Sequence, residues 1–186
     1  MVTLASPGAA ILRRRAGSVA RVSREVRELL ADMLEIMYAS NGVGLAAPQV
    51  GVGVRAIVAD AGRGPLLLVN PRITRRSGRQ VGIEGCLSVP GVVAEVERWT
   101  KVVVRARNRR GWQVEVEAED LMARVLQHEI DHLNGILFLD RADRDRIYAL
   151  ERAGDGRESP LAGQSIIDED GTPGEGARTR SRAGTA

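Results

Sequence analysis

The sequence predicts an α+β fold in which small antiparallel or mixed sheets pack around one central helix. Several short segments rich in β-branched residues are gathered between residues 54 and 117. A single strongly amphipathic helix follows them at 120–133. A series of βαβ units would instead alternate strands and helices regularly, so an α/β class is not favoured.

Length and composition fit one domain that can bury a core. The chain has 186 residues, of which 44% are hydrophobic. Its 27 basic and 24 acidic residues are scattered, and two Trp, two Tyr and one Phe leave little for base stacking, so nucleic-acid binding is not predicted. No apolar run approaches the roughly 20 residues of a membrane span. A single cysteine excludes an intramolecular disulfide, and we expect a cytoplasmic protein.

The first predicted element is an amphipathic helix that begins after Ser23, its N-cap, and runs to about Tyr38. Its apolar residues recur at steps of three and four: Val26, Leu29, Leu30, Met33, Leu34 and Met37. The glycine-rich segment 42–49 follows, with the sequence GVGLAAPQ. It is too interrupted for a helix, and we interpret it either as backbone exposed to a ligand or as a plain turn.

Five strands are predicted from β-branched content and alternation, at 54–59, 66–69, 92–96, 102–105 and 113–117. Residues 108–111 (NRRG) read as a hairpin turn between the last two. Beyond Asp140 a short charged helix is predicted, with Ile147, Leu150 and Tyr148 on its apolar side. From about residue 153 no pattern remains. We therefore predict one domain over 1–152 and a C-terminal tail over 153–186 without ordered structure.

The central helix carries the chain's only two histidines. His128 and His132 lie four residues apart, which places both imidazoles on one helical face, and Glu129 follows the first directly. Leu121, Val125, Ile130 and Leu133 make this helix half-buried, while Asp120 is a plausible N-cap and Asn134-Gly135 a stop signal. A stray pair on a surface helix is the alternative. The apolar flanks favour a metal site in which the glutamate handles the protons of a bound water.

Two histidines leave a catalytic metal ion short of one protein ligand. A downstream carboxylate, from Glu151, Asp143 or Asp145, would indicate an HExxH metallopeptidase, with Cys86 as inert packing. Cys86 is the other possible ligand, because Gly85 permits an unusual backbone and a neighbouring strand could bring the thiol to the helix. A purely structural zinc site is disfavoured, since it needs four protein ligands.

Three short motifs in order resemble the peptide deformylase family: GVGLAAPQ at 42–49, EGCLS at 84–88 and QHEIDHLNG at 127–135. The resemblance covers residues 11–150. It implies a hydrolase that removes the formyl group from the N-terminal formyl-methionine of nascent polypeptides and releases formate. The HExxH metallopeptidase remains the alternative function.

The resemblance also implies a set of site residues. Cys86, His128 and His132 would hold the metal, usually Fe²⁺, with Zn²⁺, Ni²⁺ or Co²⁺ as possible substitutes. Glu129 would act as general base and acid. The side-chain amide of Gln49 and the backbone N–H of Leu87 would stabilise the negative charge that forms on the formyl oxygen.

Substrate contacts and partners follow from the same resemblance. Gly44 and Gly85 would let the peptide lie close to the backbone as an added strand. Val43, Leu121 and Val125 flank the motifs and are candidates for the apolar pocket of the methionine side chain. The partners are N-formyl-methionyl nascent peptides, and the tail is a candidate appendage for contact with the ribosome.

Overall fold

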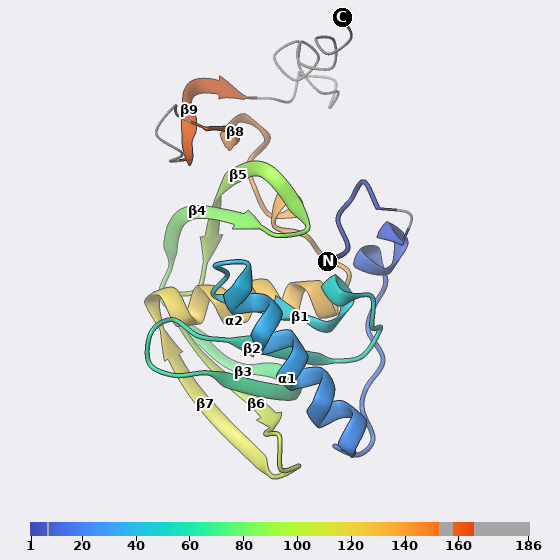
Figure 1. Ribbon diagram of the computed structural model, residues 1–186. Coiled ribbons are helices and arrows are strands. Elements are labelled where there is room, and N and C mark those ends of the chain that lie inside the picture. The colour runs from blue at the N-terminus through green and yellow to red at the C-terminus, as the bar shows by residue number, and fades with distance from the viewer. Residues whose placement is uncertain (7, 153–157, 166–186) are drawn as a thin grey trace, which may run out of the picture.

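The computed structural model describes residues 1–6, 8–152 and 158–165. Within these ranges there are two α-helices and nine strands. The strands form two sheets, and every pairing between named strands is antiparallel. The predicted α+β class with small sheets around a central helix is confirmed. Helix α2 (Asp120–Leu133) lies between the two sheets (Figure 1). No helix in the described residues has the length and apolar character that a membrane crossing requires.

The first sheet separates the two helices. Its strand order is β1 (Gly44–Ala46), β2 (Ala56–Ala59), β3 (Leu66–Ser77), β6 (Lys101–Arg107) and β7 (Gln113–Glu119). Strand β2 is buried on both faces: Ala56 and Val58 belong to the core under α1 (Arg24–Ala39), whereas Ile57 and Ala59 belong to the core under α2. Successive side chains of a strand point to opposite faces, so this four-residue strand contacts both helices.

The predicted first helix is confirmed, with Ser23 at its N-cap position. Leu30, Met33 and Met37 are its fully buried residues, as the apolar stripe predicted. Helix α2 also lies where it was predicted, but its N-cap is Glu119, and Asp120 is its first residue, with a φ of 50°. The Asp120 N–H donates to the Thr100 carbonyl at 2.8 Å, so the pairing of β7 with β6 continues up to the first residue of the helix.

The second sheet contains the largest departure from the predicted strands. Its order is β4 (Gln80–Cys86), β5 (Val89–Arg98), β8 (Ile147–Arg152) and β9 (Glu158–Ser165). Strand β4 was not predicted, because Gly82, Gly85 and Glu84 give it low β-propensity. Tertiary pairing with β5 holds it in place, for example Glu84 opposite Ala94.

Strand β3 was predicted to end at Val69 but continues to Ser77. Its register with β6 shifts between Val69 and Arg72, and again between Ile73 and Arg75. The extension was missed because Asn70, with a φ of 52°, and Pro71 interrupt the apolar pattern.

The charged helix predicted after Asp140 is wrong. The chain forms short 3₁₀ turns η3 (Phe138–Asp140) and η4 (Arg144–Arg146) and then strand β8, whose Ile147 is buried opposite Ala94. Pairing with β5 overrides the local helical pattern here. Of the predicted unstructured tail, residues 158–165 form β9 against β8, while 153–157 and 166–186 lie outside the described residues.

A buried ion cluster joins the second sheet to α2. Arg98, at the end of β5, is 4% exposed, and its Nε and Nη2 donate to the two carboxylate oxygens of Glu84 at 2.8 and 2.9 Å. Its Nη1 donates to Asp131 of α2 at 2.5 Å, and Arg141 binds the same carboxylate at 2.6 Å. Burial opposes ionisation of Glu84, but hydrogen bonds from Arg98 and His128 outweigh it and lower its pKa to about 2. The cluster is thus charged and paired in the core.

Replacing Arg98 tests how much of the stability depends on this cluster. We expect Arg98→Met to lower the free energy of unfolding by about 3–5 kcal/mol, because it removes the two short guanidinium bonds of a buried carboxylate and leaves Glu84 only the longer ion pair with Arg124, at 3.6 Å, beside its contact with His128. Arg24→Met is the matched control: its exposed pair with Glu28 should contribute less than about 1 kcal/mol. Urea unfolding of the metal-free proteins measures both. Equal stability of the two variants would contradict the assignment.

Candidate metal centre

The two histidines of α2 face the second sheet. His132 is 1% exposed, and the ring centroids of His128 and His132 lie 4.9 Å apart. Helical spacing of four residues produces this arrangement, as predicted. The imidazole of His132 has its pKa lowered to about 3, because burial penalises the cation. A neutral imidazole is the form that binds metal ions.

Cys86 completes the cluster from the end of β4. Its Sγ lies 3.2 Å from His132 Nε2, and the ligand atoms of Cys86, His128 and His132 all lie within 4.8 Å of one another. The strand reaches the helix because its register against β5 shifts after Gly85, so that Cys86 pairs with Val89 across a two-residue turn. The structure therefore brings together the three side chains predicted as metal ligands.

Two of the three downstream carboxylates, Asp143 and Asp145, do not join this cluster. In the described part of the chain, the cluster that could hold a metal consists of Cys86, His128 and His132. Asp143 instead accepts a hydrogen bond from the Asp145 N–H in η4. The side chain of Glu151 lies outside the described residues. The structure thus favours the cysteine over a carboxylate as the third ligand.

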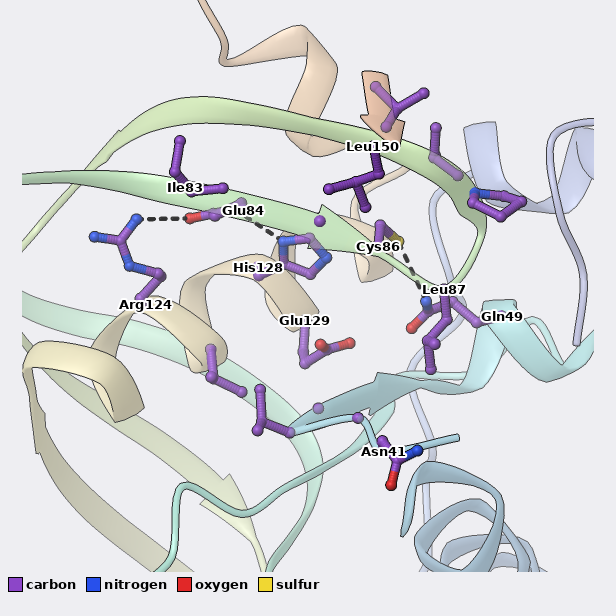
Figure 2. A pocket seen from close by; sticks show the side chains of 18 of the residues that line it. Asn41, Gln49, Ile83, Glu84, Cys86, Leu87, Arg124, His128, Glu129 and Leu150 are labelled. Carbon is purple, nitrogen blue, oxygen red and sulfur yellow. Dashed lines mark hydrogen bonds and ion pairs between the residues drawn. The ribbon is translucent and has the colours of Figure 1, made fainter. Parts of the chain in front are cut away.

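Glu84 orients the first histidine. Its Oε2 lies 2.9 Å from His128 Nδ1, which leaves Nε2 free to face Cys86 (Figure 2). A carboxylate on the second ring nitrogen is the usual partner of a metal-binding histidine. Burial disfavours the His128 cation, but hydrogen bonds with Cys86 and Glu84 outweigh it and raise its pKa to about 10. A metal ion that binds here must therefore displace a proton.

The donor set fits a catalytic metal ion. One thiolate and two imidazoles suit zinc or iron, and three protein ligands leave a position open for water. Among the described residues, the buried Oε2 of Glu129 has no hydrogen-bond partner in the chain. An unpartnered buried carboxylate oxygen beside two ligands fits a group that acts on such a water.

Glu129 is positioned by the close approach of β1. It is 3% exposed, and a Cβ on Gly44 would collide with its carboxylate and lie 2.8 Å from Val125 Cγ1. Only glycine at position 44 leaves room for the glutamate. Burial raises the pKa of Glu129 to about 7. A carboxylate with that pKa can both accept and return a proton near neutral pH.

Gln49 lies on the other side of the thiol, in η2 (Ala47–Val50). Its Oε1 accepts the Ala46 N–H at 2.8 Å, which leaves its NH₂ group directed at Cys86 Sγ (3.5 Å) and Ser88 Oγ (3.3 Å). Leu87 lies in the turn between β4 and β5, next to Cys86. The structure therefore gathers both predicted oxyanion donors beside the metal ligands (Figure 2).

A cavity of about 460 Å³ opens in front of these groups. All the predicted substrate-contact residues line it: Val43, Gly44, Gly85, Leu121 and Val125. Val43 and Leu121 are about half exposed, at 45% and 51%, and form its rim, whereas Val125 is buried deeper. His132 does not line the cavity; it is buried, whereas the other two candidate ligands, Cys86 and His128, line the cavity wall.

Sequence reasoning did not place Glu84 or Leu150 in the site, and it left the effect of Arg124 on the rim of the pocket open. Glu84 was assigned no role, although it precedes Cys86 by two residues and so shares its face of β4. Arg124, one turn before His128, lines the cavity and donates to the Gly82 carbonyl at 3.0 Å. Leu150 reaches the cavity only through the unpredicted pairing of β8 with β5.

Comparison with known proteins identifies one family. Residues 1–147 match the polypeptide deformylase family. The chain is similar to the peptide deformylases of Thermoanaerobacter pseudethanolicus (52% identity over 137 residues, covering 74% of this chain and 86% of the relative) and Carboxydothermus hydrogenoformans (53% over 136 residues, covering 73% and 90%). It is also similar to the crystal structure of the Thermotoga maritima peptide deformylase, with a TM-score of 0.73, 42% identity and coverage of 77% of this chain and 97% of that chain.

Removal of the thiol tests the ligand set. We expect Cys86→Ser to weaken metal binding by more than about 100-fold, since losing even an outer partner of a ligand costs about 10- to 100-fold. Ser88→Ala, two residues away, is the matched control and should keep its metal. The measurement is metal content after anaerobic loading with Fe²⁺ or Zn²⁺ and gel filtration. Undiminished binding by Cys86→Ser would mean that the third ligand lies elsewhere.

Proposed function

The chain belongs to the polypeptide deformylase family, and on that premise we propose which of its residues carry out removal of the formyl group from the N-terminus of a nascent polypeptide. The family is metal-dependent and hydrolytic, and formate is the product. The observation that carries the proposal is the convergence of Cys86, His128 and His132, with Glu129 and Gln49 on either side of the thiol. The roles of the individual residues follow from this geometry.

We propose that the three clustered side chains hold the metal, and that the ion is Fe²⁺, with Zn²⁺, Ni²⁺ or Co²⁺ as substitutes. When bound, the ion would lower the pKa of a coordinated water and so supply a nucleophile near neutral pH. Cys86 would bind as the thiolate, and the neutral His132 needs no deprotonation. Glu84 would hold the His128 ring in the orientation that presents Nε2.

Glu129 would move the protons of the reaction. It would accept a proton from the attacking water and deliver it to the departing amine, which becomes the free N-terminus of the product. Its burial and its pKa of about 7 support this role, because the ionised and protonated forms are then both accessible. The unpartnered Oε2 leaves one carboxylate oxygen free for the water.

Gln49 and Leu87 would stabilise the negative charge that forms on the formyl oxygen. Donors already aimed at that position cost no reorganisation during the reaction. The Ala46 N–H holds Gln49 Oε1 at 2.8 Å, so the amide cannot rotate without losing a buried hydrogen bond. The side-chain NH₂ is therefore fixed as a donor toward the centre.

The peptide would lie between two sheet edges. Strand β1 is an edge strand of one sheet and β4 is an edge strand of the other, and both border the cavity. Unpaired edges can accept an extended peptide as an additional strand, and Gly44 and Gly85 lie on these edges. The methionine side chain would then enter between Val43, Leu121 and Val125, the last of which is 5% exposed at the base.

We further propose that the substrate is met in the cytoplasm, while the nascent chain is still on the ribosome. The tail from residue 153 onward is the candidate for a ribosome contact, and the domain that carries the site would comprise residues 1–152. Most of that tail lies outside the described residues, so a comparison of ribosome binding by the full chain and by 1–152 is the relevant observation.

Formate release tests the reaction itself. Protein purified anaerobically with Fe²⁺ should release formate from a formyl-Met peptide and should leave the matching acetyl-Met peptide intact. Glu129→Gln should lose about 100- to 10,000-fold in kcat, because the amide cannot accept the proton. If the wild-type protein released no more formate than Glu129→Gln, the proposed function would be wrong.

The oxyanion donor can be tested on its own. Gln49→Leu should lower kcat by about 100- to 1000-fold, with metal content unchanged, since the lost donor acts mainly on the transition state. Gln113→Leu, an exposed glutamine on β7, is the matched control and should retain full activity. A Gln49→Leu variant within a few-fold of the wild-type rate would remove Gln49 from the proposal.

A further inference from the structure

The leading segment, residues 1–6, lies against both parts of the chain that carry the proposed oxyanion donors. The Val2 N–H donates to the carbonyl of Gln49 at 2.7 Å, and the Leu4 N–H donates to the carbonyl of Ser88 at 3.0 Å. Gln49, which accepts the first bond through its carbonyl, also carries the side-chain amide proposed as one oxyanion donor. Ser88, which accepts the second bond, directly follows Leu87, whose N–H is the other proposed donor.

These two donor segments belong to different layers. Gln49 lies in η2, directly after β1 of the first sheet, whereas the Leu87–Ser88 turn joins β4 and β5 of the second. The start of the chain lies beside η2 in Figure 1. One short stretch of backbone thus bridges two segments that the fold brings together from separate sheets.

We propose that this segment is a positioning element that sets the separation between the Gln49 amide and the Leu87 N–H. The inference rests on the proposed function, because it assumes that these two groups bind the formyl oxygen. Two side-chain contacts join the layers here: Gln49 Nε2 is 3.3 Å from Ser88 Oγ, which is long for a hydrogen bond to oxygen, and 3.5 Å from Cys86 Sγ, which is an ordinary length for a hydrogen bond to sulfur. The backbone bonds at 2.7 and 3.0 Å are near the optimum for N–H···O and constrain the spacing more tightly.

The segment is itself anchored. The Thr3 N–H donates to Ser6 Oγ at 2.9 Å, and the Ser6 N–H returns to the Thr3 carbonyl at 2.9 Å, which closes a compact turn. The chain then continues into η1 (Ala9–Arg13), whose Leu12 is fully buried, and the Ala16 N–H donates to the Leu133 carbonyl of α2. The part of the chain from η1 to Ala16 is therefore held against the helix that carries the histidines.

The exposed apolar side chains of the segment contribute little to its placement. Met1 is 48% exposed and Leu4 40% exposed, so neither is a core residue. The contacts that matter are made by backbone N–H groups. Losing them should displace the donors without emptying the core, and a misplacement of about 1 Å can cost about 100-fold in rate.

The test deletes residues 2–5 from the otherwise complete, metal-loaded protein. We expect kcat for a formyl-Met peptide to fall by about 10- to 100-fold, with KM and metal content nearly unchanged. Leu4→Pro removes one of the two bonds and should give a smaller loss of the same kind; it keeps the test valid if the deletion does not fold. Leu4→Ala, at the same position, keeps both backbone bonds and changes only a side chain that is 40% exposed, so it should match the wild type.

A double-mutant cycle separates positioning from a general loss of stability. In a Gln49→Leu background the same deletion should cost only about 3-fold or less, because one of the two positioned donors is already gone. An equal factor in both backgrounds, a rise in KM in place of the fall in kcat, or an unaffected rate would overturn the proposal. If Gln49→Leu alone retained the wild-type rate, the proposed role of Gln49 as an oxyanion donor would fail first, whatever the deletion did. Failure of the proposed function itself would show separately, as formate release by the wild type no greater than that by Glu129→Gln.

Discussion

The site depends on one buried cation, the guanidinium of Arg98. It binds Glu84, two residues before the Cys86 thiol, and Asp131, the residue before His132. Because it contacts a strand residue and a helix residue at hydrogen-bond distance, it sets the distance between the two elements that carry the proposed metal ligands. Glu84 extends the same cluster to His128 Nδ1. All three proposed ligands are thus positioned by neighbours that one arginine holds together.

Such a cluster is a poor source of stability by itself, because removing its three buried charged groups, Arg98, Glu84 and Asp131, from water costs about as much as their attraction returns. The cluster contributes instead by fixing the geometry of α2 relative to β4. An apolar replacement of the same volume would tolerate small rotations of α2 against β4, whereas paired charges at 2.5 to 2.9 Å do not. A metal site needs that restriction, since ligand distances must hold within a few tenths of an ångström. The ion cluster is therefore best understood as part of the metal centre.

The sequence predicted the elements that depend on interactions between residues close together in the chain, and it missed those that depend on contacts between distant segments. Helix α2, with both histidines and Glu129, was found because helical periodicity is local. Cys86 and Gln49 remained ambiguous from the residues alone and gained roles only through the family motifs. Strand β4 was not predicted because Gly82 and Gly85 weaken its local β-strand pattern. Hydrogen-bonded pairing with β5 stabilises the strand in the folded protein. The contacts of Val2 and Leu4 left no trace in the sequence, since they use backbone N–H groups that every residue other than proline has.

Gly44 shows how two demands meet at one position. An exposed sheet edge is normally a liability, because its free N–H and C=O groups invite unwanted pairing. Here β1 and β4 turn their edges toward one cavity, and β1 must also pass close enough to α2 to bury Glu129. A side chain at position 44 would displace the carboxylate of Glu129 and crowd Val125. The glycine of the GVGLAAPQ segment therefore links the placement of the proposed acid–base group to the edge strand that borders the cavity, because both depend on the same close approach of β1 to α2.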